Sequence, residues 1–428
     1  MTHHTFEIKN LTKVEARASL TIKLEDKEVK EVNLEVGEGA RYFEAMLVNR
    51  KYDEAASITQ KICGICSVIH TVGSVKAIEN AIGIQPSKQT IDLRKLLIIA
   101  GQLHSHVVHL YFLTLPDYLG FESILTMSKK RHEEVHRALR MEKLSTDILR
   151  IIGGRPVHPV SVGIGTFTDV PNKEELGTIL KKLNDMKEDA IKTAKLFASF
   201  KTPNFESITR RCALRRDGEY PLYDGKITST DGIEFDAKDY KKHITEHMKE
   251  YSTAINARLN EERLMVGALA RLNLNYKCLS DDAKLLLNTS GIKLPNFSPF
   301  TNNFAQAIEL VHFIDEGMEI TNKFIQSGLK KETIGVKPKK GEGIMAVEAP
   351  RGILYYHYTL DDKGVIRHAN IITPTEQNLE SIENDIKNFF PRISHLPKEK
   401  ITLELEKLIR AYDPCISCPT HFLEVKFL

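Results

Sequence analysis

The chain of 428 residues has no tryptophan, few cysteines and no marked excess of either charge. Its 60 basic and 57 acidic residues leave a formal net charge of +3, which argues against a nucleic-acid partner or an anionic membrane surface. No continuous apolar run reaches the roughly 18 residues that cross a bilayer, and the start "MTHHTFEIKN" lacks the pattern of a secretory signal. We therefore expect a cytoplasmic protein with no membrane span.

Six cysteines are too few for a secreted scaffold that depends on disulfides. In a reducing compartment, paired cysteines are more often metal ligands or redox catalysts than structural bridges. The sequence also lacks a glycine-rich dinucleotide fingerprint, so we expect nicotinamide or flavin chemistry to belong to other chains. With 42% hydrophobic residues, the chain has enough apolar surface for a large core.

The hydrophobic pattern predicts a mainly α-helical α+β fold. Alternating apolar residues at 20–24 and 32–36, around "EDKE", predict an N-terminal β hairpin. Spacings of three and four residues predict helices over 67–119, 132–151, 173–200, 240–272 and 304–326. The stretch 215–232 is rich in turn residues and predicts a surface excursion. Strands around a "DDKG" turn are predicted over 344–372, followed by two last helices.

We expect one interwoven domain, since no linker is long enough to separate independent units. Within 1–428 it has a β-rich part at 1–48, a helical body at 49–335, and a β hairpin with a C-terminal ligand tail at 336–428. Such a fold brings distant segments together only through tertiary packing.

Four of the six cysteines form two Cys-x-x-Cys pairs near opposite ends of the chain. Cys63 and Cys66 lie in "KICGICSVIH", and Cys415 and Cys418 lie in "DPCISCPTH". A three-residue offset lets two sulfurs face one metal. A structural zinc site, a redox-active dithiol and two unrelated pairs of core cysteines are the alternatives. Four thiolates suit zinc, iron or nickel, whereas magnesium and calcium prefer oxygen ligands.

The separation of the pairs argues against a zinc clip that nucleates folding. Structural zinc sites usually join pairs about 15 to 20 residues apart, whereas these pairs lie roughly 350 residues apart, which adds about 2.6 kcal/mol of loop-closure entropy. A metal inserted after folding gains from ligands near the chain end, because that segment can stay open until insertion.

The two motifs, in this order and at opposite ends, resemble the signatures of the nickel–iron hydrogenase large subunit over nearly the whole chain. The resemblance is to the cytoplasmic group that includes archaeal sulfhydrogenase α subunits and NAD(P)-linked enzymes. It implies that Cys63 and Cys415 bind nickel, and that Cys66 and Cys418 bridge nickel to an iron carrying carbonyl and two cyanide ligands. His70 would hydrogen-bond a bridging sulfur.

Further residues take roles through the same resemblance. "TKVEARASL" makes Glu15 the carboxylate that carries the proton. "VEAPRGILYYH" places Arg351, preceded by Pro350, above the open face of the metals. Thr375 would hydrogen-bond a cyanide, and Asp413 would hold Arg351 in place. Glu15, Arg351 and Cys415 are therefore the expected catalytic residues, whereas an isolated glutamate or arginine is more often a surface residue.

A second cation and a processing step also follow from the resemblance. Glu44, His421 and the backbone carbonyl of Ile371 would bind magnesium or iron near the C-terminus. A histidine ligand is unusual for so hard an ion as magnesium, so the metal stays open. A dedicated maturation protease would cleave after His421 and remove "FLEVKFL".

One position departs from the periplasmic members of the family. Ser105 stands where those enzymes carry an aspartate partner of the arginine, as in the cytoplasmic group. His104, His106 and His109 look like a metal cluster, but residues 104 and 106 cannot share a helix face, so we expect structural roles. Cys212 and Cys278 are expected to be buried thiols.

The resemblance implies reversible cleavage of H2 into protons and electrons. With four cysteines committed and two isolated, the chain cannot also hold an iron–sulfur relay. We therefore expect a small subunit with iron–sulfur clusters, further flavin and iron–sulfur subunits, and NAD(P) or another soluble acceptor such as sulfur or polysulfide. The alternatives are a structural subunit like that of respiratory complex I and a zinc–thiolate protein without hydrogenase activity.

Overall fold

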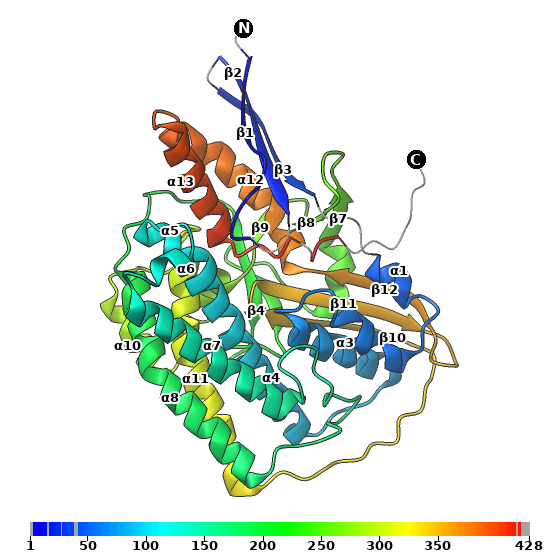
Figure 1. Cartoon of the computed structure of the whole chain (residues 1–428). Coiled ribbons are helices and arrows are strands. Elements are labelled where there is room, and N and C mark those ends of the chain that lie inside the picture. Colours follow the sequence, from blue (N-terminus) through cyan, green and yellow to red (C-terminus); the bar gives the residue numbers. More distant parts are fainter. Residues whose placement is uncertain (1–2, 15–16, 27, 38–41, 417, 421–428) are drawn as a thin grey trace.

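The computed structural model describes residues 3–14, 17–26, 28–37, 42–416 and 418–420, and it is mainly helical with small sheets (Figure 1). The helices are α1 (Phe43–Leu47), α2 (Ala55–Thr59), α3 (Ser67–Ile82), α4 (Lys88–Val107), α5 (Leu115–Leu119), α6 (Ile124–Met127), α7 (His132–Gly153), α8 (Lys173–Ala198), α9 (Ala268–Asn275), α10 (Asp281–Thr289), α11 (Thr301–Ser327), α12 (Pro374–Ile393) and α13 (Lys398–Ala411). The strands are β1 (His3–Ile8), β2 (Ala18–Glu25), β3 (Glu28–Val36), β4 (Arg210–Arg215), β5 (Lys226–Ser229), β6 (Glu234–Phe235), β7 (Ile244–Met248), β8 (Ile255–Leu259), β9 (Leu264–Met265), β10 (Gly341–Ala349), β11 (Gly352–Leu360) and β12 (Ile366–Ile372). The predicted α+β class is confirmed.

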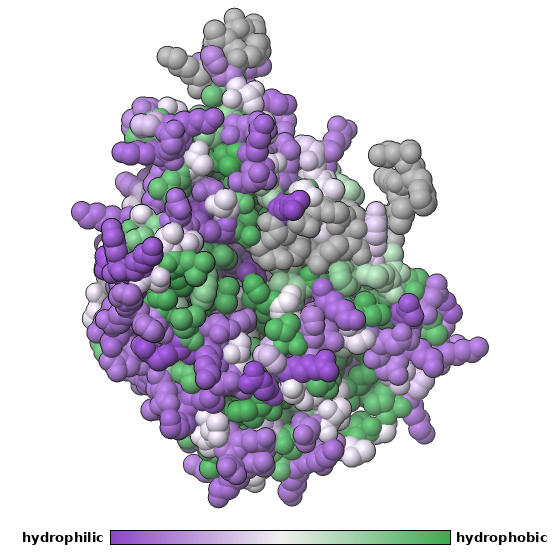
Figure 2. Space-filling model, viewed as in Figure 1, coloured by the Kyte–Doolittle hydropathy of each residue, from purple (hydrophilic) through white to green (hydrophobic). Residues whose placement is uncertain are grey.

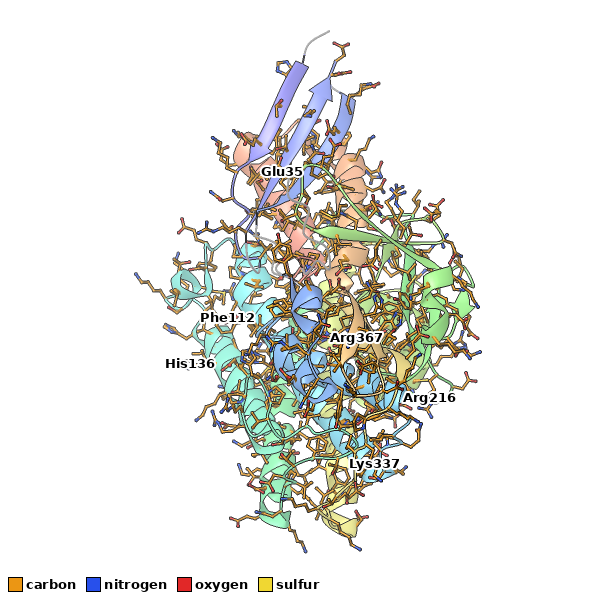
Figure 3. All side chains as sticks on the ribbon, turned by 90° about the vertical axis from the view of Figure 1, so that its right-hand side faces the viewer. Glu35, Phe112, His136, Arg216, Lys337 and Arg367 are labelled. Carbon is orange, nitrogen blue, oxygen red and sulfur yellow. The ribbon has the colours of Figure 1, made fainter. Side chains whose placement is uncertain are left out.

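The predicted N-terminal hairpin is present as β2 and β3, with Leu20 opposite Leu34 and Ile22 opposite Val32 in its antiparallel register. The sequence analysis missed β1, which adds a third strand on the free edge of β2. Its opening residues are polar, so the apolar alternation is short. This sheet projects from the body beside α12 and α13 in both the first view and the view turned by 90° (Figures 1 and 3).

Long helices form the body of the protein. The predicted helices over 132–151, 173–200 and 304–326 are confirmed as α7, α8 and α11. Asn172 begins α8 by accepting the backbone N–H groups of Glu174 and Glu175, as an N-cap residue does. The predicted stretch 67–119 is broken after α3 by Gly83, whose φ of 71° suits a helix end.

The segment Lys88–Leu119 contains α4, a π-helical turn (Val108–Thr114) and α5, and it is long and apolar enough to cross a membrane. Its most apolar window is 78% buried inside the protein. A core helix passes the same test of length and composition, so this is weak support for a membrane span.

The predicted helix over 240–272 is wrong. The chain there forms a short 3-10 turn (Ala237–Lys242), strands β7, β8 and β9, and only at its end α9. Asn260 and Glu261 have φ values of 47° and 62°, which a right-handed helix does not contain. The interpretation of 215–232 as a surface excursion is also wrong, because Tyr220 and Tyr223 are buried and 226–229 is strand β5.

The predicted C-terminal strands form the antiparallel sheet β10–β11–β12, followed by α12 and α13 as expected. Strand β10 packs closely against α3, where Gly341 and Gly343 lie against the backbone of Ala81 and Ala77. The turn between β10 and β11 carries Arg351. This packing brings the turn to the start of α3, where the first cysteine pair lies.

Candidate metal centre

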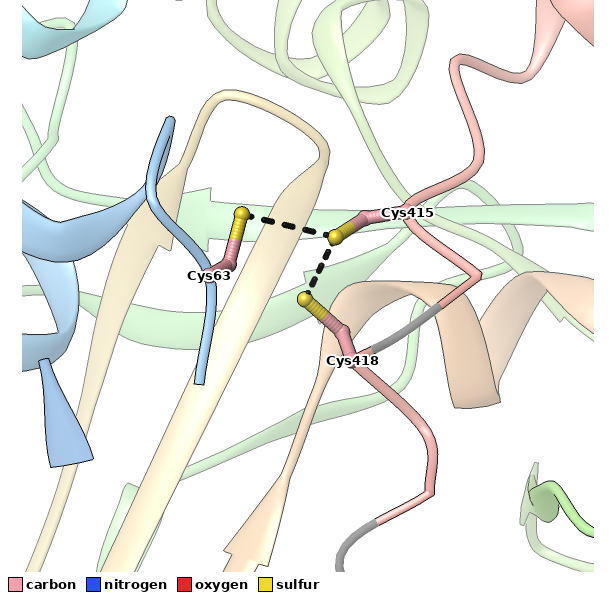
Figure 4. Close-up of side chains that lie close together, drawn as sticks. All are labelled: Cys63, Cys415 and Cys418. Carbon is pink, nitrogen blue, oxygen red and sulfur yellow. Dashed lines mark hydrogen bonds between the residues drawn. The ribbon is translucent and has the colours of Figure 1, made fainter. Parts of the chain in front are cut away.

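The sulfurs of the two distant cysteine pairs lie together inside the protein. The Sγ atoms of Cys63 and Cys415 are 3.5 Å apart and those of Cys415 and Cys418 are 2.7 Å apart, and dashed lines join them in Figure 4. Both distances exceed the roughly 2.05 Å of a disulfide. These three residues form a buried group that could hold a metal ion, and Cys66 is buried beside them. The amide of Cys66 donates to the sulfur of Cys63 at 3.4 Å.

The local backbone structure brings the sulfurs of both cysteine pairs to the same place. Cys63 and Cys66 lie in the turn that begins α3, and the carbonyl of Cys66 accepts the first helical N–H groups. After α13 ends, Asp413 takes a left-handed φ of 51°, and a tight turn joins the N–H of Cys418 to the carbonyl of Cys415 at 3.1 Å. Aspartate tolerates that conformation better than most residues, so the reversal before Cys415 has a sequence cause.

The four sulfurs differ in how strongly they hold a proton. Hydrogen bonds from Cys415, Cys418 and Cys66 hold the pKa of the Cys63 thiol well below its usual range. Burial raises the pKa of Cys415, and the bond to Cys63 with burial raises that of Cys66. The cluster therefore stabilises Cys63 as a thiolate, whereas Cys66 and Cys415 hold their protons more tightly. Four buried sulfurs that converge in this way fit iron and nickel as ligands.

Arg351 lies against these sulfurs. Its Nη1 donates to Cys66 Sγ at 3.1 Å, its Nη2 pairs with Asp413 Oδ1 at 3.0 Å, and its Nε donates to the Asp413 carbonyl at 2.8 Å. Although burial alone would lower it, the pKa of Arg351 is raised well above its usual value by Asp413 and the cysteines. A fixed positive charge therefore faces the sulfur cluster. Pro350, before it, has its carbonyl bound by Arg271 at 3.0 Å.

Thr375 and His70 lie close to the same cluster. The Thr375 hydroxyl oxygen accepts the N–H of Cys415 at 3.0 Å, so it fixes the ligand loop from the start of α12. His70, one turn after Cys66 on α3, is buried, and its Nδ1 lies 2.6 Å from the hydroxyl of Tyr356.

The predicted second cation site is only partly within the described residues. Glu44 is buried, and its carboxylate accepts the N–H of Ile371 at 2.6 Å. Burial, and then the nearby Glu246, raise the pKa of Glu44 well above its usual value. Burial, followed by Glu246 and Glu44, also raises the pKa of Glu376 in the same region. A cation bound among these carboxyl groups would offset both their burial and their mutual repulsion. Glu15 and His421 lie outside the described residues.

Four residues near the site were not predicted from the sequence: Glu376, Glu246, Tyr356 and Gln306. Glu376 directly follows Thr375 and could have been found by its place in "TPTEQN". The other three carry no sequence signal, because each approaches the site only through tertiary packing. Gln306 donates to Asp413 Oδ2 at 2.9 Å.

The three histidines of α4 and the following turn do not converge on a metal within the described part of the chain. His106 bonds Glu309 at 2.8 Å, His109 bonds Gln306 at 2.5 Å, and His104 lies 3.8 Å from Glu142. Ser105 is fully buried, and its hydroxyl has no partner among the described residues. Cys212 is buried as expected, but Cys278 is only half-buried.

Known proteins resemble this chain over ranges that include the residues of the site. The family model for nickel-dependent hydrogenase matches residues 41–155 and 217–421, which include both cysteine pairs. The sulfhydrogenase 1 α subunit of Pyrococcus furiosus is 34% identical over 420 residues, with 98% of each chain covered. The β subunit of the NAD-reducing hydrogenase HoxS of Cupriavidus necator is 26% identical, with 96% of this chain and 94% of that one covered.

Solved structures show the same fold. An NAD+-reducing [NiFe]-hydrogenase in the H2-reduced state superposes with a TM-score of 0.88 at 24% identity, covering 98% of this chain and 99% of the other. A [NiFeSe]-hydrogenase from Dm. baculatum superposes with a TM-score of 0.80 at 20% identity, covering 98% and 100%. With four converging cysteines inside a full-length match, the chain belongs to the nickel-dependent hydrogenases, as the catalytic subunit of an oxidoreductase that acts on H2.

Proposed function

We propose that the four cysteine sulfurs hold the nickel and iron of this hydrogenase, with Cys63 and Cys415 on nickel and Cys66 and Cys418 bridging to iron. The iron would carry one carbonyl and two cyanide ligands. The observation that carries the assignment is the convergence of Cys63, Cys415 and Cys418 beside Cys66 and Arg351. A nickel–iron pair bound there supplies the electrophile and electron acceptor for cleavage of H2.

In this proposal, side chains of the protein place a positive charge beside the metals, hold the ligand loop and carry the proton. Arg351 keeps a positive charge beside Cys66 at any working pH, because a guanidinium does not deprotonate. Thr375 and Asp413 fix the loop that carries Cys415. His70, oriented by Tyr356, acts as a polar neighbour of a bridging sulfur. Glu15 takes the proton from the cluster and passes it toward solvent.

Glu44, the carbonyl of Ile371 and His421 would bind the second cation, magnesium or iron. The contact between Glu44 and Ile371, the raised pKa of Glu44 and the neighbouring carboxylates support a positive charge there. Such an ion would lie near the end of the chain, where it would stabilise the closed C-terminal loop. Metal content beyond one nickel and one iron per chain tests this proposal.

Electrons would leave through a small subunit with iron–sulfur clusters and then reach flavin and iron–sulfur subunits. The relatives named above are themselves subunits, and one is named for NAD reduction. Near the first cysteine pair, Val157 and Val160 are 40% and 51% exposed, and a Cβ added at Gly64 would lie 4.0 Å from Val157. These exposed apolar side chains support a docking face there. Hydrophobic patches interrupt the hydrophilic surface (Figure 2).

NAD(P) is the proposed acceptor in the cytoplasm, with sulfur or polysulfide as the second candidate. Assays of the purified complex with each acceptor separate the two.

A maturation protease would cleave after His421 once nickel is in place. The ligand loop that ends in Cys418 directly precedes this point, so removal of the extension would let the loop close. The intact mass of the metal-loaded chain tests the proposal, since a mass that includes Leu428 contradicts it.

Two variants of the anaerobically purified holoenzyme test the metal centre and the proton route together. Cys418→Ser removes a soft bridging ligand, so we expect loss of nickel and of H2 uptake. Glu15→Gln keeps the metals but cannot accept a proton, so we expect H2-dependent proton exchange to fall at least 100-fold, within the usual range for general acid–base catalysis of about 10²–10⁴.

Wild-type protein should contain nickel and iron and show infrared bands of carbonyl and cyanide. Zinc alone in the wild type would overturn the metal assignment. Normal proton exchange in Glu15→Gln would overturn the proton route while leaving the metal assignment intact.

A further inference from the structure

Helix α11 carries a buried polar stripe in its first half, although its surroundings are mostly apolar. Asn302, Gln306 and Glu309 occupy positions i, i+4 and i+7, so they share one helix face. None is more than 2% exposed. A buried polar side chain persists where it makes specific hydrogen bonds, so the partners of this stripe indicate its role.

The middle residue of the stripe acts on the side chain of Arg351 through Asp413. The Oε1 atom of Gln306 accepts from His109 Nδ1 at 2.5 Å, because a carbonyl oxygen can only accept. This bond fixes the amide so that Nε2 points the other way and donates to Asp413 Oδ2 at 2.9 Å. The other oxygen of Asp413 pairs with Arg351 at 3.0 Å. Gln306 therefore holds the carboxylate whose rotation would move the guanidinium.

The last residue of the stripe acts on the backbone of the same loop through Arg271. Both Glu309 oxygens accept from Arg271, at 2.6 and 2.8 Å. The remaining three N–H groups of Arg271 bind Glu348 at 3.0 Å and the carbonyls of Ala349 and Pro350 at 2.9 and 3.0 Å. All five donors of this guanidinium are thus used. They fix the two peptide groups directly before Arg351.

The first residue of the stripe connects the contacts made through Asp413 with those made through Arg271. Asn302 Nδ2 donates to the carbonyl of Ala411 at 2.8 Å, and its Oδ1 accepts the N–H of Leu269 at 2.8 Å. It therefore links the loop that leads to Asp413 with the helix that carries Arg271. The contacts of one helix face reach both the side chain and the backbone of Arg351.

We propose that this face of α11 orients Arg351 toward the metal centre, and that Gln306 is a positioning residue which acts through Asp413. The inference rests on the proposed role of Arg351 beside the metals. A guanidinium held from two directions keeps its charge aimed at one point without reorganisation during turnover, which is how a preorganised charge assists a reaction.

A double-mutant cycle on the holoenzyme tests the proposal. Gln306→Met keeps the size of the side chain but removes the amide. We expect about a tenfold loss of H2 turnover with nickel and iron content unchanged, which lies within the range of coupled neighbouring residues. In an Arg351→Lys background the same change should have no further effect, because the residue it positions is gone. In a crystal structure of Gln306→Met, Arg351 Nη1 should lie beyond hydrogen-bonding distance of Cys66 Sγ.

Asn273→Leu is the matched control. This variant also removes a buried amide, one that pairs with the backbone of Asn296 rather than with the Arg351 loop. It should leave turnover unchanged. If Gln306→Met does not incorporate metal, Gln306→Asn withdraws the same donor with a smaller change.

Equal losses in both backgrounds, or an unmoved Arg351 in the crystal structure, would overturn the inference. Wild-type protein without nickel, iron or H2 turnover would instead overturn the proposed function, so the two failures can be told apart.

Discussion

At the scale of single residues, one buried cation is shared by two buried carboxylates. Glu309 takes two of the Arg271 donors and Glu348 takes one. Although burial opposes it, the attraction of Arg271 lowers the pKa of Glu309 to about 2. Burial raises the pKa of Glu348 to about 7, because the pairing with Arg271 does not compensate its desolvation. When both carboxyl groups are ionised, the single positive charge of Arg271 therefore faces two negative charges, those of Glu309 and Glu348.

This imbalance predicts that stability falls as the pH rises. Glu348 binds a proton more tightly in the folded chain than in the unfolded chain, whose ordinary pKa is 4.5. The folded state therefore holds an extra proton between pH 4.5 and 7, so stability falls as the pH rises through this range, and the loss is complete above pH 7. The difference corresponds to about 3 kcal/mol. Relative to the wild type, Glu348→Gln should gain about that free energy of unfolding between pH 5 and pH 8, measured by urea denaturation.

Glu380→Gln serves as the control for this pH dependence. Hydrogen bonding and charge from Arg258 and Lys249 outweigh burial and lower the pKa of Glu380 to about 2. Its stabilisation is fully present above pH 4.5 and is lost only in stronger acid. The variant should therefore lose the same free energy at pH 5 and pH 8. A constant difference for Glu348→Gln as well would show that Glu348 is ionised throughout this range.

At the scale of elements, the contact between α3 and β10 sets the distance from the first cysteine pair to the Arg351 turn. A Cβ at Gly343 would overlap the carbonyl oxygen of Ala77 and lie 2.5 Å from the N atom of Ala81. One turn before Ala77 on α3, Gly73 makes room in the same way for the ring of Tyr356, 3.0 Å from an added Cβ. Glycines thus allow helix and sheet to approach closely.

Gly343→Ala should separate α3 from β10 and destabilise the protein by about 1–3 kcal/mol or more, because backbone atoms cannot move aside as a side chain would. Nickel content should fall with stability, since Cys66 directly precedes α3 as its N-cap residue. Gly177→Ala on α8 is the matched control. Nothing lies within 4 Å of its added Cβ, so it should stabilise the helix by about 0.5–1 kcal/mol. Thermal unfolding compares both variants, and an unchanged midpoint for Gly343→Ala would contradict the tight contact.

The elements that sequence periodicity predicts correctly are those whose buried face repeats regularly. The helices α7, α8 and α11 and the strands around 344–372 are of this kind. The helix expected over 240–272 fails because apolar residues of short strands, such as Ile244 and Leu259, also recur at near-helical spacing. The cysteine pairs were visible in the sequence, whereas Gln306 and Arg271 reach the site only through packing, which no local pattern reports.

At the scale of the whole molecule, two segments from opposite ends of the sequence, around Thr12 and around Arg410, lie side by side. The carbonyl of Thr12 accepts from Arg410 Nε and Nη2 at 2.9 and 2.6 Å. Asp117 on α5 forms ion pairs with both Lys13 and Arg410, of which the pair with Arg410 is fully buried. Arg410 lies five residues before Cys415 and Lys13 two residues before Glu15. One carboxylate thus ties the segment of the proposed proton carrier to the segment of the last metal ligands.

Asp117→Asn should loosen both ends at once. It keeps the shape of the side chain but removes the negative charge between Lys13 and the buried Arg410. Because Arg410 keeps its ion pair with Glu406 at 2.9 Å, the expected cost is about 1–3 kcal/mol. Hydrogen–deuterium exchange of the backbone should therefore quicken at residues 10–14 and 409–416 while the centre of α11 stays protected. H2-dependent proton exchange should fall with metal content retained.

Glu404→Gln, which breaks only a partly exposed ion pair on the same helix as Arg410, should change stability by less than about 0.5 kcal/mol. Uniformly faster exchange throughout Asp117→Asn would mean that Asp117 stabilises the fold as a whole and does not join its two ends.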